Sequence, residues 1–306
     1  MEMSQRADEI SKEDYRTIVC TFLSTHKFNV VKNDPDVENA VFTQFLRYEE
    51  ISEEKARYLA IIGASTAQHF YPYHKRETRQ AIGIFTAFLG AVDDHGAQFL
   101  SGIQQFGQSI VGDTSQTSLL RDYKDLCSQF GNYYTPFCAD RILVGTINFV
   151  SSTALENESH DFAHLSKAPN FPHYFRSMTG LSEAFAWLLL AEEFCSSARF
   201  DLFIQIAPDL MDYTDGLNDL LSFYKEYFLA TEETNPICLR AKAEGCDLKK
   251  VLHSLCTELE RYADRMKEVV SEDPELLRLL DAYLQGSIGL HISQIRYRLH
   301  ELSLPV

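Results

Sequence analysis

The stretch NDLLSFYKE, residues 218 to 226, carries three oxygen-bearing side chains at intervals of four residues: Asn218, Ser222 and Glu226. In an α-helix such side chains advance in steps of about 40° and form one narrow stripe. An amide, a hydroxyl and a carboxylate are hard oxygen ligands, which suit Mg²⁺ better than Zn²⁺. The alternative is an ordinary amphipathic helix whose polar side chains face water, because the leucines of this stretch form an apolar stripe.

A second acidic feature follows residues 81 to 92, which are apolar around the whole circumference of a helix and should be buried. This run ends directly in Asp93 and Asp94. Adjacent carboxylates are unfavourable at the end of a buried helix unless cations meet them, and the helix dipole also disfavours them there. A surface helix that ends near Gly96 is the alternative. We therefore expect a positive group near this pair.

Four further side chains supply cationic or phenolic donors: Lys225 beside the glutamate, Arg176 in YFRSMTG, and Arg296 with Tyr297 in QIRYRL. Each of them alone is more typical of an ordinary surface contact. Together with two oxygen-rich clusters, they favour a diphosphate that is held by magnesium and bound by arginine forks.

The composition excludes several classes of partner. A formal charge of −16 argues against nucleic acid or an anionic membrane, since neither attracts such a surface. The longest apolar runs fall short of the ~18 residues of a membrane span. The seven cysteines are scattered without a C-x-x-C pair, and the first residues resemble neither a signal nor a transit peptide. We expect a cytoplasmic protein.

Helical periodicity extends over most of the chain, and the 14 glycines and 9 prolines are few enough to predict long elements. We expect one all-α domain, residues 1–306, with ten or more helices and a flexible tail of about ten residues at the start. A break is expected near Pro208. The helices that the pattern predicts are 53–70, 77–94, 138–156, 174–197, 200–229, 247–270 and 274–301.

With these motifs in this order, the sequence resembles a class I terpene cyclase, most closely the fungal trichodiene synthase family of sesquiterpene cyclases. The resemblance covers roughly residues 50 to 300. It rests on Asp93-Asp94, Arg176, the N-D-x-x-S-x-x-K-E pattern of 218–226 and Arg296-Tyr297. It implies a helical barrel that encloses an apolar cavity, with the two metal motifs facing each other across its mouth.

The resemblance implies three Mg²⁺ ions. Asp93 would bridge two of them, and Asn218, Ser222 and Glu226 would hold the third. The usual aspartate-rich motif has an acidic residue where this chain has Ala97. We expect activity to survive that departure, because the first aspartate makes most of the metal contacts in this family.

The resemblance also implies the diphosphate contacts. Asp94 is expected to pair with Arg296 rather than to bind metal, while Thr179 and Gly180 match the positions where a helix breaks toward the substrate. The expected donors to the diphosphate are Arg176, Lys225, Arg296 and Tyr297.

Helical spacing from Asp93 and Arg296, with two looser guesses, suggests which side chains form the cavity wall. Each of them is also compatible with the ordinary core. The expected wall residues are Phe85, Thr86, Leu89, Phe149, Trp187, Ser287 and Leu290.

The expected activity is that of a lyase: Mg²⁺-dependent ionisation of farnesyl diphosphate, then cyclisation of the carbocation. A humulyl-type 1,11-closure is the expected first ring closure, with 1,10-closure and 1,6-closure after isomerisation as alternatives. A chain-elongating prenyl diphosphate synthase and a non-enzymatic helical interaction protein are the competing interpretations. By resemblance, we also expect a homodimer.

Overall fold

The computed structural model describes residues 10–112, 117–157, 165–232 and 234–304, apart from the side chains of His95 and Ala97. Within these ranges the chain forms helices and no strand, so the all-α expectation is confirmed. The expected N-terminal tail falls almost wholly outside the described residues. The α-helices are α1 Lys12–Thr25, α2 Pro35–Phe45, α3 Glu53–Phe70, α4 Arg76–His95, α5 Leu100–Ile103, α6 Phe106–Val111, α7 Ser118–Gln129, α8 Pro136–Glu156, α9 Phe171–Thr179, α10 Ser182–Trp187, α11 Ser197–Phe223, α12 Pro236–Glu244, α13 Leu248–Val269 and α14 Pro274–Ser293.

Local sequence signals start the long helices. The Ser52 hydroxyl accepts a hydrogen bond from the Lys55 N–H at the start of α3, and Asp247 caps α13 in the same way. Asp273 caps α14, where Pro274 occupies the first turn and loses no helical hydrogen bond. These caps explain why the starts of α3, α13 and α14 agree with the expected boundaries to within a residue or two.

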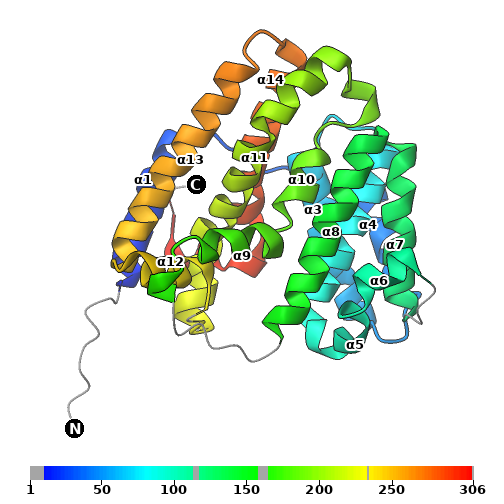
Figure 1. Cartoon of the computed structure of the whole chain (residues 1–306), viewed down its shortest axis with the longest axis horizontal. Coiled ribbons are helices and arrows are strands. Elements are labelled where there is room, and N and C mark those ends of the chain that lie inside the picture. Colours follow the sequence, from blue (N-terminus) through cyan, green and yellow to red (C-terminus); the bar gives the residue numbers. More distant parts are fainter. Residues whose placement is uncertain (1–9, 113–116, 158–164, 233, 305–306) are drawn as a thin grey trace.

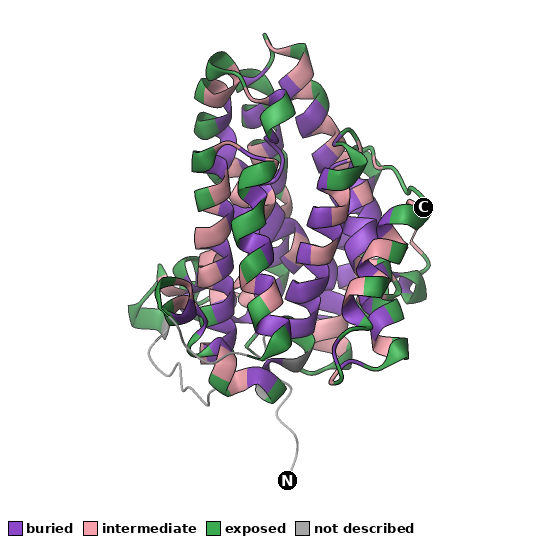
Figure 2. Cartoon of the chain, turned by 90° about the vertical axis from the view of Figure 1, so that its right-hand side faces the viewer, coloured by how far each residue is buried: buried purple, intermediate pink, exposed green. Residues whose placement is uncertain are grey.

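The long helices lie side by side, with their buried residues toward neighbouring helices and their exposed residues on the outside (Figures 1 and 2). Helix α3 packs between α4 and α14. A Cβ atom on Gly63 would collide with the carbonyl oxygen of Gly83 in α4, and one on Gly286 in α14 would collide with the carbonyl of His69. Glycine therefore lets both neighbours approach α3 closely, which brings the ends of α4 and α14 to the same side of the molecule.

Three boundaries differ from the expectations. Helix α11 runs through Pro208 without a break. Pro208 and Ile204 are both exposed, so the Ile204 carbonyl that loses its helical partner is on the side toward water. The predicted helix 174–197 is two helices, α9 and α10, which are separated at Gly180 and Leu181.

The third difference concerns the C-terminus. Helix α14 ends at Ser293 instead of continuing to residue 301, and a short 3₁₀ turn, η6, spans Ile295–Tyr297. The two predicted donors near the C-terminus therefore lie on a turn after the helix. No helix in the described ranges is both long enough and apolar enough to cross a lipid bilayer.

Candidate active site

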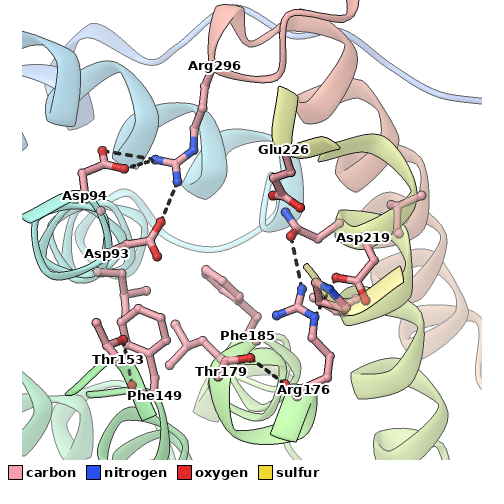
Figure 3. Close-up of a pocket in the computed structure, with 18 of the residues that line it drawn as sticks. Asp93, Asp94, Phe149, Thr153, Arg176, Thr179, Phe185, Asp219, Glu226 and Arg296 are labelled. Carbon is pink, nitrogen blue, oxygen red and sulfur yellow. Dashed lines mark hydrogen bonds and ion pairs between the residues drawn. The ribbon is translucent and has the colours of Figure 1, made fainter. Parts of the chain in front are cut away.

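A cavity of about 570 Å³ lies between the ends of the helices that carry both acidic motifs. This volume is in the range of small-molecule sites, roughly 300–1,000 Å³. Asp93 and Asp94 lie on one side of the mouth, and Glu226 of the second motif lies across from them (Figure 3). The two motifs, far apart in the sequence, therefore share one pocket.

Arg296 is the positive group that the aspartate pair requires. Its Nη2 atom is 2.6 Å from Asp93 Oδ2, and its Nη1 atom is 3.2 Å from Asp94 Oδ1. Burial opposes its charge, but the two aspartates raise the pKa of Arg296 above the ordinary arginine value. The expected pair with Asp94 is present, and a pair with Asp93 accompanies it. Burial also raises the pKa of the neighbouring Tyr297 to about 12, so its phenol stays a donor at neutral pH.

Helix α3 contributes two residues at this side of the mouth that the sequence analysis did not single out. Burial raises the pKa of Tyr58, although Arg296 beside it acts in the opposite direction. Burial lowers the pKa of Lys55, while Asp94 raises it. Neither residue belongs to a recognisable motif, and only the packing of α3 against α4 brings them here.

The second motif begins on α11 and ends in a π-helix, η5, that spans Tyr224–Leu229. The expected stripe of three side chains assumed an α-helix throughout, and that assumption is wrong after Phe223. The wider turn sets the direction of Glu226, whose Oε1 is 3.3 Å from Lys225 Nζ. Such π-turns are frequent at functional sites. Asn218, Lys225 and Glu226 line the pocket.

Ser222 provides a test of whether the second motif fits a metal ion. The residue is only 1% exposed, it does not line the pocket, and its hydroxyl has no hydrogen-bond partner among the described residues. A buried hydroxyl without a partner is costly, so such an atom on the oxygen-rich turn between Asn218 and Glu226 fits a missing ligand. No three His, Cys, Asp or Glu side chains in the described ranges are close enough to hold a metal alone. A metal ion at this motif would therefore also need the amide oxygen of Asn218 and the hydroxyl oxygen of Ser222 as ligands.

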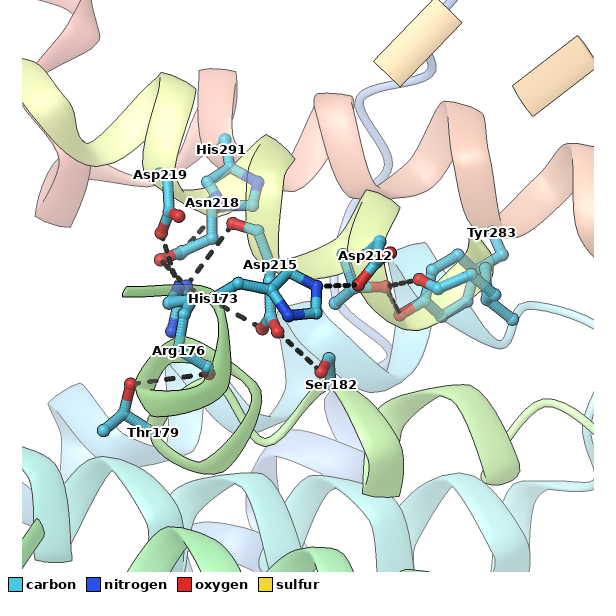
Figure 4. Close-up of polar contacts among 12 residues, drawn as sticks. His173, Arg176, Thr179, Ser182, Asp212, Asp215, Asn218, Asp219, Tyr283 and His291 are labelled. Atoms are coloured by element: carbon cyan, nitrogen blue, oxygen red, sulfur yellow. Dashed lines mark hydrogen bonds and ion pairs between the residues drawn. The ribbon is translucent and has the colours of Figure 1, made fainter. Parts of the chain in front are cut away.

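Arg176 joins α9 to this motif. Its Nε atom donates to Asp219 Oδ1 at 2.7 Å, and its Nη2 atom donates to Asn218 Oδ1 at 3.1 Å (Figure 4). Burial raises the pKa of Asp219 to about 7 and that of Asp215 to about 6, although Arg176 lowers both. Asp215 Oδ2 also accepts a hydrogen bond from the Ser182 hydroxyl. The sequence analysis missed Asp215 and Asp219, although Asp219 belongs to the motif itself.

The break between α9 and α10 is built by close packing. A Cβ atom on Gly180 would collide with Asp215 Oδ1, so only glycine fits against this carboxylate. The next residue, Leu181, has φ +55°, a strained conformation for a leucine that is typical of functional sites. Thr179 lines the pocket, and its hydroxyl lies 3.5 Å from the Arg176 carbonyl.

Two glutamates at the mouth have no counterpart in the sequence analysis. Although Glu156, at the end of α8, is exposed on one side, partial desolvation at the mouth raises its pKa to about 7, and the charge of Asp93 adds to this effect. Partial desolvation also raises the pKa of Glu232, which is likewise exposed on one side, and the charge of Glu226 acts in the same direction. Their spacing in the sequence carries no signal, since helix packing alone brings them beside the motifs.

Five of the seven residues expected in the cavity wall line the pocket: Thr86, Leu89, Phe149, Ser287 and Leu290. Phe85 and Trp187 do not. Phe85 is fully buried against the rings of Tyr123 and Phe130. Phe85 precedes Asp93 by eight residues, so around the helix axis its side chain points about 80° away from that of Asp93. For Leu89, four residues before Asp93, the angle is about 40°.

Trp187 packs outside the pocket against aromatic side chains of α8 and α11, Phe137 and Phe203. Phe70 and Phe185 line the pocket and were not anticipated. The substitution at Ala97 lies among the side chains that the structure does not describe.

Residues 34–304 match the family model described as trichodiene synthase (TRI5). The chain belongs to the trichodiene synthase family. Longiborneol synthase CLM1 of Gibberella zeae is 31% identical over 80% of this chain and 73% of its own length. Terpene synthase BipA of Cochliobolus sativus is 30% identical over 81% and 77%. (E)-beta farnesene synthase of Metarhizium brunneum is 26% identical over 89% and 83%.

Solved structures agree on the fold. Linalool/nerolidol synthase from Streptomyces clavuligerus superposes with a TM-score of 0.63 at 13% identity, over 87% of this chain and all of the other. Wild-type cucumene synthase gives 0.58 at 12% identity, again over 87% of this chain and all of the other. As a terpene synthase, the chain is a lyase that acts on a prenyl diphosphate, in a family that generally uses divalent metal ions.

Proposed function

We propose that this terpene synthase is a Mg²⁺-dependent sesquiterpene cyclase that ionises farnesyl diphosphate and cyclises the resulting carbocation. The observation that carries the proposal is the convergence of both oxygen-rich motifs and four donors on the mouth of one cavity. The relatives named for farnesene and longiborneol support the choice of a C15 substrate. We further propose that residues 1–306 act as one cyclase domain, which functions in the cytoplasm as a homodimer.

Three Mg²⁺ ions would supply charge stabilisation for the departing diphosphate. Asp93 would hold two of them, and Asn218, Ser222 and Glu226 would hold the third. Before substrate arrives, the chain keeps its own cations against these ligands: Arg296 on Asp93, and Lys225 on Glu226. The same cations are then at hand to bind diphosphate oxygens.

The donors of the site have complementary tasks. Arg176, Arg296 and Lys225 carry fixed positive charge toward the diphosphate, and Tyr297 donates a neutral hydrogen bond. Burial of both guanidiniums strengthens each contact that they make, because little water competes there. Asp94 retains Arg296 at the mouth and needs no metal contact for that purpose.

The deep part of the pocket suits a carbocation. Phe149, Phe185 and Phe70 offer aromatic faces that attract positive charge. Leu89 and Leu290 offer inert surface that selects how the isoprenoid chain folds. Water must be excluded while the cation exists, because any nucleophile captures it. We propose a 1,11-closure first.

The competing enzyme is a chain-elongating prenyl diphosphate synthase. Such enzymes carry two aspartate-rich motifs, whereas the second motif here presents Asn218 and Ser222 beside Glu226. The membership in a terpene synthase family also argues against elongation. It argues equally against a helical protein without enzymatic activity.

The decisive experiment incubates the purified protein with farnesyl diphosphate and Mg²⁺ and analyses the organic extract by gas chromatography and mass spectrometry. A cyclic C15 hydrocarbon or alcohol is the expected result. An acyclic terpene would support the proposed ionisation of the substrate and contradict the proposed cyclisation. A longer prenyl diphosphate, formed when isopentenyl diphosphate is added, would favour elongation.

A further inference from the structure

His291, on α14, lies at a position that none of the motifs assigns. It is buried and lines the pocket. Its Nδ1 atom is 2.7 Å from the Ser287 carbonyl oxygen. Its Nε2 atom is 3.2 Å from Asn218 Nδ2 (Figure 4). Its ring centroid is 4.3 Å from that of Tyr297. One imidazole therefore touches both the second metal motif and the C-terminal diphosphate donors.

The partners determine which nitrogen carries the proton. A carbonyl oxygen only accepts, so the Nδ1–H of His291 donates to Ser287. In the neutral ring, Nε2 then holds the lone pair and accepts from the amide NH₂ of Asn218. This contact turns the amide so that its oxygen points away from the imidazole.

The contact with Arg176 agrees with this orientation. Asn218 Oδ1 accepts from Arg176 Nη2 at 3.1 Å. If the amide were reversed, its NH₂ group would face the guanidinium NH₂ group of Arg176. Its oxygen would then face the lone pair on Nε2 of His291. Both contacts therefore select the orientation in which the amide oxygen of Asn218 points toward Arg176, a residue that also lines the pocket.

We propose that His291 is a positioning residue that holds the Asn218 amide with its oxygen presented for the metal ion. The inference rests on the proposed function, in which Arg176 turns to the diphosphate and gives up its contact with Asn218. The hydrogen bond from Asn218 to His291 then holds the orientation. Partners that orient a metal ligand typically change metal affinity about 10–100-fold when they are removed.

The chain contains a matched control in His69 on α3. Its Nδ1 is 2.8 Å from the Ser65 carbonyl oxygen, four residues earlier, as in His291. It is also buried, but its Nε2 accepts from the Val31 N–H at 3.2 Å and it does not line the active-site pocket. Replacing His69 therefore removes an equivalent buried imidazole without touching Asn218.

The test compares His291→Leu, His291→Gln and His69→Leu. Isothermal titration calorimetry measures Mg²⁺ binding in the presence of saturating inorganic diphosphate, without turnover. We expect His291→Leu to weaken Mg²⁺ binding about tenfold, at the low end of the range for ligand-orienting partners. His291→Gln, whose side-chain oxygen reaches the position of Nε2, should restore most of the affinity. His69→Leu should lower the melting temperature and leave Mg²⁺ affinity unchanged.

Equal Mg²⁺ affinities in His291→Leu and His69→Leu would overturn the proposal, as would a glutamine variant no better than the leucine variant. A second measurement uses only the unaltered protein, so it does not depend on whether His291→Leu folds. Spectra of ¹⁵N-labelled histidine in the unaltered protein with Mg²⁺ and diphosphate should show His291 protonated at Nδ1 alone, and protonation at Nε2 would contradict the proposal.

Failure of the two proposals is distinguishable. If the unaltered protein forms terpene while the three variants bind Mg²⁺ alike, the cyclase stands and the positioning role falls. If Mg²⁺ binding follows the expected order but no terpene forms, the positioning role stands and the cyclase falls.

Discussion

The two sides of the active-site mouth are built differently. On the α4 side, the side chains of Asp93 and Asp94 are 47% and 29% exposed and are held by the guanidinium of Arg296. On the α11 side, Arg176 lies in a buried network with Asp215 and Asp219. Exposed ion pairs contribute little stability, whereas breaking a buried pair is costly. We infer that the α11 side is preorganised, apart from the contact between Arg176 and Asn218, and that the α4 side makes the larger adjustment when substrate binds.

The strongest challenge to this comparison is removal of the second motif. Asn218→Ala and Glu226→Ala should each abolish or nearly abolish turnover, since they delete oxygens from the preorganised side. Helical circular dichroism should stay intact. Full activity in both variants would show that the third metal site does not depend on this motif.

The α4 side is tested by Asp93→Asn. A loss of about a thousandfold in kcat/KM is expected, equivalent to about 4 kcal/mol of transition-state stabilisation. Asp94→Asn should lose less, because it removes a partner of Arg296 and leaves the proposed ligand in place. Steady-state kinetics on both variants decide the matter, and equal losses would mean that both aspartates bind metal.

Restoring the acidic residue that the family usually carries should matter little. Ala97→Asp is expected to change kcat by less than about tenfold, or ~1.4 kcal/mol, because the position adjusts closure and is not needed for the metals. The measurement is again steady-state kinetics with farnesyl diphosphate. A much larger gain would mean that the metal site on the α4 side is incomplete in this protein.

Product selection separates the cavity wall from the core. Leu290→Ala should change the ratio of terpene products, with turnover affected only a few-fold, because Leu290 lines the pocket. Phe85→Leu should leave the ratio unchanged and destabilise the fold by about 1–3 kcal/mol, since Phe85 packs in the core. Product chromatograms and thermal melts of the two variants provide the comparison. A changed ratio in Phe85→Leu would return this residue to the wall.

The smallest effect concerns pH and the buried network. Asp219 has a pKa of about 7 in the folded protein because burial raises it above the usual carboxyl value. A raised carboxyl pKa means that the folded state binds the extra proton, so this stability is present at low pH and is lost as pH rises through about 7.

We therefore compare the melting temperature of Asp219→Asn with that of the unaltered protein at each pH. This difference should favour the variant by a few degrees more at pH 8 than at pH 5. Melts of the metal-free proteins at both pH values measure this, and a difference that is constant across pH would contradict the assignment.

Much of the candidate site could be predicted from the sequence because its signals are local. A wholly apolar run that ends in Asp93-Asp94 predicts a buried helix with an unmet need for positive charge. The four-residue spacing of 218–226 predicts oxygens gathered along α11. Neither signal predicted the π-helix, since the extra residue in a turn reflects how η5 packs and leaves no mark in the spacing.

Residue types and helical period by themselves determined the all-α class and the starts of α3, α13 and α14, and they singled out the side chains proposed to hold a metal ion or a diphosphate. Only the tertiary structure decided that α14 ends early enough for Arg296 to turn back onto Asp93 and Asp94. The tertiary structure also shows that Phe85 and Trp187 pack in the core and that His291 contacts Asn218. The physical reason is that a helix period defines which side chains share a face, while the partner of that face depends on packing between helices far apart in sequence.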